Sequence, residues 1–315
     1  MKKGYKTGFA LGLCCTLLSA VYGCGKNETQ ALQPCEYQQE AVSRQADFLT
    51  NQDLAEYVNA NSVSVHNQVW NSKNYQYTLK ECFYDGTIGL CVSTIEIRGK
   101  DGADLKEDEI ENWKTMIQQD VLDVSIEDHD STPLERDVTY GEHSVSFRQA
   151  FTFSTICDKD TTKNPTSCAQ GLTMQLTEQK KNGVETGCLA LPKETVKHTD
   201  QLTLKKGKSS EVLSIEITPY GAQVIWNTAQ AEKNYKKQME KGAEEEDLDL
   251  EIWNTMKLVE TDGKEFDLCS GSMVYTNEDE ENTDNHLAVY QVIFSKKISL
   301  KNVKNMVIDD RKYEV

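Results

Sequence analysis

The sequence predicts an all-β protein that consists of two tandem β-sandwiches with short helical insertions. Apolar and polar residues alternate along many short segments, and this period of two is typical of half-buried strands. The dipeptide Asp-Gly lies between such segments at 85–86 and at 262–263, where it favours a hairpin turn. The chain has only 5 prolines among its 315 residues, so few strands are interrupted.

The N-terminal residues have the composition of a secretory signal. Three lysines precede an apolar run that is short for a bilayer span of about 20 apolar residues. Gly23 stands directly before Cys24, and Val21 lies three residues ahead of that cysteine, as in a bacterial lipoprotein signal. We therefore expect cleavage after Gly23 and a thioether-linked diacylglycerol (palmitate-type) anchor on Cys24. Because Tyr22 is unusual in such a signal, ordinary cleavage and an uncleaved anchor remain open.

The charge of the chain disfavours several classes of partner. Its formal net charge of −17 becomes −20 once the three lysines of the predicted signal are removed. Nucleic acids and anionic lipids would repel such a chain, so we expect no nucleic-acid partner. A two-chain lipid on Cys24 would hold the protein on the outer face of the cell membrane, where an unknown surface or membrane protein is the expected partner.

The length of the chain suggests two domains behind the signal. The predicted parts are a signal peptide at 1–23, a lipid-attached helical linker at 24–61, a first sandwich at 62–198 and a second sandwich at 199–315. The linker is assigned as helical because apolar residues recur at helical spacing between 36 and 60. The boundary lies where a polar stretch near residue 198 interrupts the alternation.

The first sandwich begins with a predicted hairpin at 75–99. Tyr77, Leu79 and Phe83 are expected on one face of its first strand. Helical spacing returns at 107–122, and this helix is expected to cover an opening at the edge of the sheet. Its apolar stripe comprises Ile110, Trp113, Ile117 and Val121.

Two further strands of the first sandwich are predicted at 144–157 and 172–176, where the period of two returns. Their apolar positions are Val145, Phe147, Phe151, Phe153, Leu172, Met174 and Leu176.

A second alternating series builds the second sandwich. Leu213, Ile215 and Ile217 are expected on one face of a strand that turns at 219–221. The segments expected after it are a strand ending at Trp226, a helical insertion at 229–242, a hairpin around Asp262-Gly263, a strand at 288–294 and a closing strand at 297–310.

Cysteine usage is consistent with an exported chain. Seven of the ten cysteines remain once the signal and the lipid site are set aside, so at least one stays unpaired or bonds another chain. Two local disulfides are candidates: Cys82 with Cys91 across the first hairpin, and Cys157 with Cys168 around a loop. Loops of about ten residues would each add roughly 2 to 3 kcal/mol of stability.

No metal or other cofactor is expected. The chain contains no C-x-x-C pair of the kind that structural zinc sites need. Acidic clusters at 127–131 and 277–285 supply oxygen ligands, but neither has the glycine and terminal glutamate of the twelve-residue calcium loop. We interpret both as solvated loops, with weak calcium binding as the alternative.

Several stretches resemble a known family. A strand followed by YDG, a second series beginning LTLKKGKSSEVLSIEITPYGAQVIW, the segment DGKEF and a final ISLKNVKNMVID are similar to the paired extracellular domains of anti-sigma-factor-type membrane proteins and lipoproteins of Gram-positive bacteria. The resemblance covers roughly 62–310 and implies immunoglobulin-like domains of unknown function. The cytoplasmic sigma-binding portion of that family is replaced here by the lipoprotein signal, and the family supplies no catalytic residue.

The expected function is a non-enzymatic binding or sensory module on the cell surface, with a link to envelope stress implied by the resemblance. No serine-hydrolase elbow, zinc-protease or phosphate-loop motif occurs in the sequence. The alternatives are an enzyme that acts on a cell-wall polymer and a passive spacer. An enzyme would need a deep cleft with a carboxylate of raised pKa or a positioned nucleophile, and a spacer would have a uniformly polar surface.

Overall fold

The computed structural model describes residues 33–38, 46–118, 122–126, 131–153, 172–180, 183–192, 195–196, 201–204, 212–227, 256–268, 273–274, 287–308 and 311–315. The predicted signal, Cys24, Cys157, Cys168, the insertion at 229–242 and nearly all of both acidic clusters lie outside these residues.

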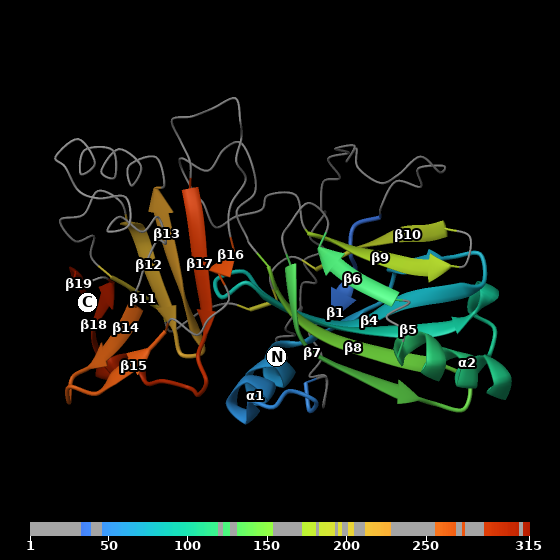
Figure 1. The fold of residues 1–315 in the computed structure, drawn as a ribbon, viewed down its shortest axis with the longest axis horizontal. Helices are drawn as coiled ribbons and strands as arrows, with labels where there is room; N and C mark the ends of the chain where they lie inside the picture. The colour runs from blue at the N-terminus through green and yellow to red at the C-terminus, as the bar shows by residue number, and fades with distance from the viewer. Residues whose placement is uncertain are drawn as a thin grey trace, which may run out of the picture.

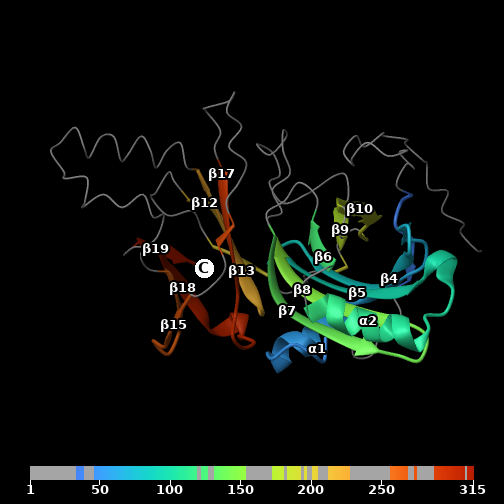
Figure 2. The same cartoon turned by 45° about the vertical axis from the view of Figure 1, so that its right-hand side comes forward.

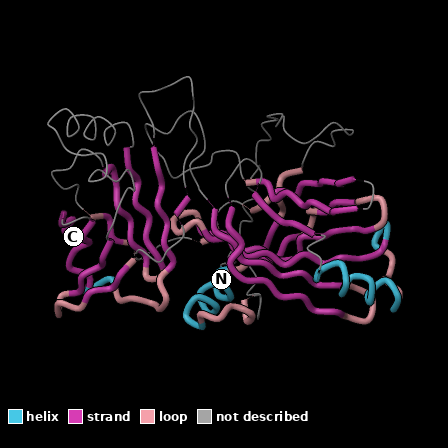
Figure 3. The backbone as a smooth tube through the Cα atoms, in the orientation of Figure 1, coloured by secondary structure: helices cyan, strands magenta, loops and turns pink. Residues whose placement is uncertain are grey.

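The protein is mostly β, as Figure 3 shows, which confirms the all-β part of the predicted fold class. The strands of the first half are β1 (Tyr37–Gln38), β2 (Val63–Val65), β3 (Val69–Asn71), β4 (Tyr75–Asp85), β5 (Leu90–Gly99), β6 (Leu122–Ile126), β7 (Ser131–Tyr140), β8 (Val145–Phe153), β9 (Thr173–Lys180) and β10 (Gly183–Ala190). Those of the second half are β11 (Leu202–Thr203), β12 (Val212–Thr218), β13 (Gly221–Asn227), β14 (Met256–Glu260), β15 (Glu265–Asp267), β16 (Met273–Val274), β17 (Leu287–Ile293), β18 (Val303–Ile308) and β19 (Arg311–Glu314). The helices are α1 (Gln52–Asn61), α2 (Glu107–Gln118) and the short 3₁₀ turns η1 (Lys100–Gly102) and η3 (Leu300–Asn302).

The first half packs two antiparallel sheets around one core. Its larger sheet has the order β1-β2-β4-β5-β8-β7 with β3 added to β4, and its smaller sheet has the order β10-β9-β6 (Figure 1). Helix α2 contributes Ile110, Trp113 and Ile117 to the same core, which confirms the predicted helix and most of its apolar stripe. The side chains that the sheets bury together include Tyr77, Leu79, Ile95, Ile97, Val124, Ile126, Phe147, Phe151, Met174, Leu176 and Leu189.

The second half repeats the same arrangement. Its sheets have the orders β11-β12-β13-β17-β16 and β15-β14-β18-β19. The order β4-β5-β8-β7 thus recurs as β12-β13-β17-β16, and β6-β9-β10 recurs as β14-β18-β19. Its core is separate from the first one and includes Ile215, Ile217, Val224, Leu258, Tyr290, Val292, Met306, Ile308 and Tyr313.

Backbone details repeat as well. The amide of Phe153 at the end of β8 donates to the carbonyl of Gly89 at 2.9 Å, and the amide of Phe294 after β17 donates to the carbonyl of Tyr220 at 2.8 Å. In both halves, the hairpin turn before that carbonyl is capped by the side chain that ends the preceding strand, Asp85 in one and Thr218 in the other.

These two turns meet where the halves join, beside α1 (Figure 2). The ring of Tyr57 on α1 stacks on that of Tyr220, with centroids 3.9 Å apart. The amide Nε2 of Gln291 on β17 donates to the carbonyl of Gly86 at 3.1 Å. A third apolar cluster fills the junction and comprises Ala46, Leu49, Leu54, Ala55, Tyr57, Val58, Phe83, Ile88, Leu90, Val92, Ala150 and Val196.

The predicted helix over 36–60 is wrong in its first part. Tyr37–Gln38 forms β1, because its backbone pairs with β2 in the register Tyr37 to Val65. The helix begins after Asn51, whose side-chain oxygen accepts a hydrogen bond from the amide of Leu54 at 3.1 Å. Long-range strand pairing therefore overrides the helical spacing before residue 39.

The predicted hairpin at 75–99 is confirmed, but the predicted face of Phe83 is wrong. A bulge between Leu79 and Glu81 shifts the register by one residue. Tyr77 and Leu79 therefore enter the first core, whereas Phe83 turns to the opposite face and packs in the junction cluster with α1.

A second bulge, between Val212 and Ser214, shifts the register in the second half. Val212 is therefore buried, whereas Leu213, which was predicted on the buried face, is only half-buried. The predicted strands that lead to Phe153, Leu176 and Phe294 are confirmed, and their described apolar residues are buried.

Candidate functional site

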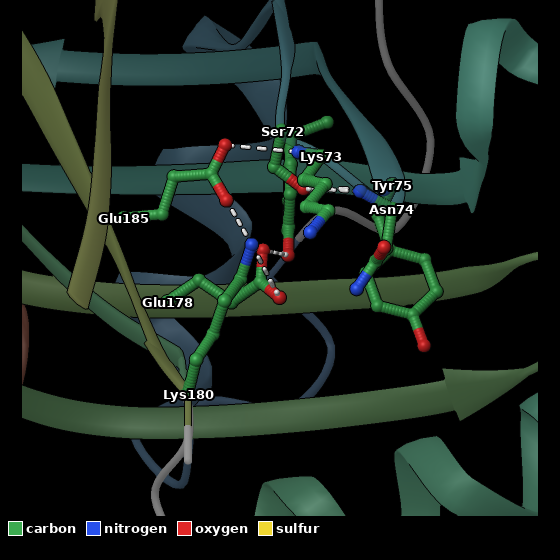
Figure 4. A network of polar contacts seen from close by, with 8 residues as sticks. Ser72, Lys73, Asn74, Tyr75, Glu178, Lys180 and Glu185 are labelled. Carbon is green, nitrogen blue, oxygen red and sulfur yellow. Dashed lines mark hydrogen bonds and ion pairs between the residues drawn. The ribbon is translucent and has the colours of Figure 1, made fainter. Parts of the chain in front are cut away.

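Polar and aromatic side chains gather at the end of the first half where the β3–β4 turn meets the β9–β10 hairpin. Figure 4 shows the polar part of this group, which we call the edge network: Ser72, Lys73, Asn74, Tyr75, Glu178, Lys180 and Glu185. The rings of Trp70, Tyr75, Tyr77 and Trp113 lie beside it.

Glu178 is the buried centre of the edge network. It follows Met174 and Leu176 on the inward face of β9, so the strand carries a carboxylate to a position where its side chain is 2% exposed. The hydroxyl of Tyr77 donates to Oε2 of Glu178 at 3.0 Å, and the ammonium of Lys180 lies 3.7 Å from Oε1. A buried carboxylate needs such partners because water is absent.

Glu185 extends the network to the opposite sheet. It lies directly across β9–β10 from Glu178 and forms an ion pair with Lys180, so one ammonium serves two carboxylates. Its Oε1 also accepts a hydrogen bond from the backbone amide of Lys73 at 2.9 Å. Within the turn, Oγ of Ser72 accepts a hydrogen bond from the amide of Tyr75 at 3.1 Å. These contacts fasten the small sheet to the large one.

The rings form a stack from the surface to the core. Trp70 stacks on Tyr77 with centroids 4.7 Å apart, and Tyr75 meets Trp113 edge-on at 5.0 Å. A Cβ on Gly187 would lie 2.1 Å from the ring of Trp70, so the indole can lie flat on β10 only because that residue is glycine. Trp70 and Tyr75 are half-exposed, whereas Tyr77 and Trp113 are fully buried.

Burial and nearby carboxylates keep both tyrosines protonated. Desolvation raises the pKa of Tyr77 well above its ordinary value, with the charge of Glu178 as the next cause. Desolvation also raises the pKa of Tyr75, with smaller contributions from Glu109 and Glu178. The phenols are therefore neutral donors at any physiological pH. Half-exposed rings beside a fixed ion-pair network are suited to hold a ligand by stacking and hydrogen bonds.

Trp113 has one feature that the packing leaves unexplained. Its indole Nε1 is buried and has no hydrogen-bond partner among the described residues. A buried donor without a partner costs about 1 to 3 kcal/mol.

The structure places two of the predicted site residues, Cys82 and Cys91. Both are fully buried free thiols on the same face of the β4–β5 hairpin. Cys82 faces Ser93 rather than Cys91 across the hairpin, so the two cysteines are diagonal neighbours. Burial and a hydrogen bond between the two thiols raise the pKa of Cys82. The disulfide across the hairpin stays a prediction.

The other predicted site residues, Cys24, Cys157 and Cys168, lie outside the described residues. Cys35 is half-buried against the first core, and desolvation raises its pKa to about 12. Within the part of the chain that the structure describes, no three metal-ligating side chains converge, and no helix is long and apolar enough to cross a membrane.

Glu178, Lys180 and Trp70 were not among the site residues predicted from the sequence. A signal for Glu178 exists, because a charged residue continues the alternation of Met174 and Leu176 on the buried face. Trp70 gives no comparable signal, since its partner Gly187 lies more than a hundred residues away in the sequence.

Comparison with known proteins adds little. No family model matches the chain, and no curated protein matches it. A solved structure described as "the crystal structure of the conserved domain protein from Bacillus anthracis" matches with 12% identity over 85% of this chain and 79% of that chain, at a TM-score of 0.33. A TM-score this low supports no conclusion about fold or function.

Proposed function

We propose that this protein is a lipid-anchored, non-enzymatic binding module on the outer face of the cell membrane, and that the rings above the edge network contact its partner. The observation that carries this proposal is the pair of half-exposed rings, Trp70 and Tyr75, fixed beside the Glu178–Lys180 ion pair. Large aromatic side chains on a rigid support are typical of binding surfaces, because they bury apolar area at little cost in entropy.

We further propose that each half is an immunoglobulin-like sandwich. This is supported by the strand orders, since β4-β5-β8-β7 and β10-β9-β6 correspond to the orders ABED and GFC of constant-type immunoglobulin domains. The second half has the same correspondence, with β15 added beside β14. The resemblance to paired extracellular domains of anti-sigma-factor-type proteins agrees with this assignment, and it suggests a role in envelope-stress sensing.

The proposal is tested by crosslinking the tagged protein in its own cells and identifying the captured molecules by mass spectrometry. We expect a defined surface or membrane partner that is lost with Tyr75→Ala, because this change removes a half-exposed ring of the site, and lost with Cys24→Ala, because this change removes the anchor. Tyr37→Ala is the matched control, since Tyr37 is 40% exposed on β1 and is not part of the edge network.

Each outcome decides between the functional classes. A partner captured equally by the wild type, Tyr75→Ala and Tyr37→Ala would show that binding takes place elsewhere on the surface. If no molecule is captured at native expression, a passive spacer becomes the better explanation. Hydrolysis of wall polymer by the purified protein would support the enzyme alternative instead.

A further inference from the structure

A cluster of lysines lies on the second half, next to α1. We define the basic cluster as Lys264, Lys296, Lys297 and Lys301, all of which are exposed. Lys301 belongs to η3, which meets the turn before Lys264 where the amide of Thr261 donates to the carbonyl of Asn302 at 2.7 Å. The stretch 287–308, from which three of them come, contains four lysines and no aspartate or glutamate. This composition is unusual in a chain whose formal net charge is −17.

Aromatic rings hold three of these ammonium groups in place. The Nζ atoms of Lys264 and Lys296 lie 5.1 Å and 4.7 Å from the centroid of Phe266, and that of Lys297 lies 5.5 Å from the centroid of Tyr220. Phe266 is itself fixed, because it packs against the core of the second half. Two ammonium groups around one ring lie within about 10 Å of each other, which is one Debye length at 0.1 M salt, so they repel each other.

The nearby carboxylates do not neutralise this charge by direct ion pairs. Asp53 on α1 accepts a hydrogen bond from the backbone amide of Lys297 at 2.8 Å. Asp262 accepts one from the backbone amide of Lys264 at 2.9 Å. Glu260 lies in the same turn, but among the described residues no ion pair involves any lysine of the basic cluster. Unpaired like charges that are held together favour an anionic ligand.

The basic cluster contacts α1 through Lys297. The side-chain amide of Asn51, which caps α1, donates to the carbonyl of Phe294 at 3.0 Å, and Asp53 in the first turn of α1 binds the next part of the same loop. In Figure 1, α1 and the connection from β17 to β18 both lie on the lower side of the molecule. Helix α1 is the last part of the predicted linker at 24–61, so a lipid on Cys24 would keep the cluster near the membrane surface and raise its effective concentration there.

We propose that the basic cluster binds the phosphate groups of anionic phospholipids in the membrane that carries the protein. This inference rests on the proposed lipid anchor, because the anchor holds the protein beside that membrane; the four lysines give a weaker affinity of their own, which an excess of vesicles makes measurable. Each lysine near an anionic surface strengthens binding about fivefold, and the effect decays within one Debye length. The net negative charge of the chain as a whole disfavours contact with anionic lipid, so the attraction is local to the basic cluster, and repulsion of the remaining surface orients the molecule with this cluster toward the lipid.

The test is co-sedimentation of the exported full chain carrying Cys24→Ala with vesicles of phosphatidylglycerol mixed with phosphatidylcholine. Without the anchor, any binding comes from the protein surface. We expect binding that weakens as salt rises and that falls by several hundredfold when all four lysines are changed to glutamine, from about fivefold per lysine. The matched control carries Lys80→Gln, Lys100→Gln, Lys106→Gln and Lys114→Gln, which remove the same charge from the first half.

The proposal would be overturned by no binding, by equal binding to pure phosphatidylcholine, or by equal losses in the two quadruple variants. Binding to a soluble poly(glycerol phosphate) but not to vesicles would also overturn it, because the phosphate source would then be a wall polymer. Thermal unfolding of both variants establishes that they are folded. The anchor itself is tested separately by the mass of the lipid on wild-type Cys24, so failure of one proposal is distinguishable from failure of the other.

Discussion

At the scale of single residues, buried polar groups determine which substitutions the first half tolerates. Glu178 lies in an apolar core and is held there by one hydroxyl and one ammonium, Tyr77 and Lys180. The ordinary rule that carboxylates stay at the surface fails at this position, and such exceptions persist only where each partner is in place. Changes to these partners are therefore the most informative at this scale.

Removing the hydroxyl of Tyr77 is expected to destabilise the protein. In Tyr77→Phe, the buried carboxylate of Glu178 loses its hydrogen-bond donor while the ring packing is kept. We expect the free energy of unfolding to fall by about 1 to 3 kcal/mol, measured by urea denaturation. Tyr140→Phe is the control, because Tyr140 lies at the half-exposed end of β7. Equal losses in both variants would contradict a specific role for the Tyr77 hydroxyl.

Glu81 is expected to make stability depend on pH. Desolvation raises its pKa in the folded state, and the opposing effects of Thr94, Arg148 and Lys80 are smaller. A carboxyl whose folded pKa is above its unfolded value stabilises the fold at low pH, and this contribution is lost as pH rises through the folded pKa. Glu81→Gln should therefore be more favourable to stability at pH 7 than at pH 4. If the free energy of unfolding differs between Glu81→Gln and the wild type by the same amount at both pH values, this prediction is wrong.

At the scale of elements, the β4–β5 hairpin connects the two halves. Its strands were predictable from alternation and from the Asp-Gly turn, because both are local patterns. The bulge at Lys80 was not, since a register shift depends on pairing with β5 and on α1 covering the far face. The bulge is what sends Phe83 into the junction, so the local pattern alone gives the wrong neighbours for that residue.

Gly89 in the turn of this hairpin is expected to be intolerant of substitution. Its φ is +61°, and an added Cβ would lie 2.0 Å from Oε1 of Gln291 and 2.4 Å from the carbonyl oxygen of Phe153. We expect Gly89→Ala to cost about 2 to 4 kcal/mol in urea denaturation, from strain and overpacking. Gly263→Ala separates the two causes, because Gly263 has φ +87° but no atom within 4 Å of an added Cβ. If both variants lose the same stability, contact with Gln291 contributes nothing.

At the scale of the whole molecule, the junction is expected to couple the unfolding of the two halves. Helix α1 contacts the second half through Tyr57, Asn51 and Asp53, and the β4–β5 turn contacts it through Gln291. Interfaces that are buried and hydrogen-bonded couple the unfolding of the parts they join, whereas polar linkers do not. The spacing of the proposed binding surface and the basic cluster is therefore fixed.

Calorimetry is expected to show this coupling as a single unfolding transition. Tyr57→Ala removes the ring that stacks on Tyr220 and the hydroxyl that donates to Asp85 at 2.6 Å. We expect a loss of about 3 to 5 kcal/mol and a separation into two transitions, as for other large aromatic truncations in a packed site. Two transitions in the wild type would show that the junction does not couple the halves.

The sequence by itself determined the type of most described elements: the hairpins, helix α2 and the mostly β composition follow from periods and turn residues that act over a few positions. Tertiary structure alone decided the bulges at Lys80 and Leu213, the partners of Glu178, the junction and the basic cluster beside α1. The physical reason is the distance along the chain over which each interaction acts. Alternation of apolar and polar residues is local and indicates which side chains are buried. Register, ion pairing and contacts between distant loops depend on which surfaces the folded chain brings together.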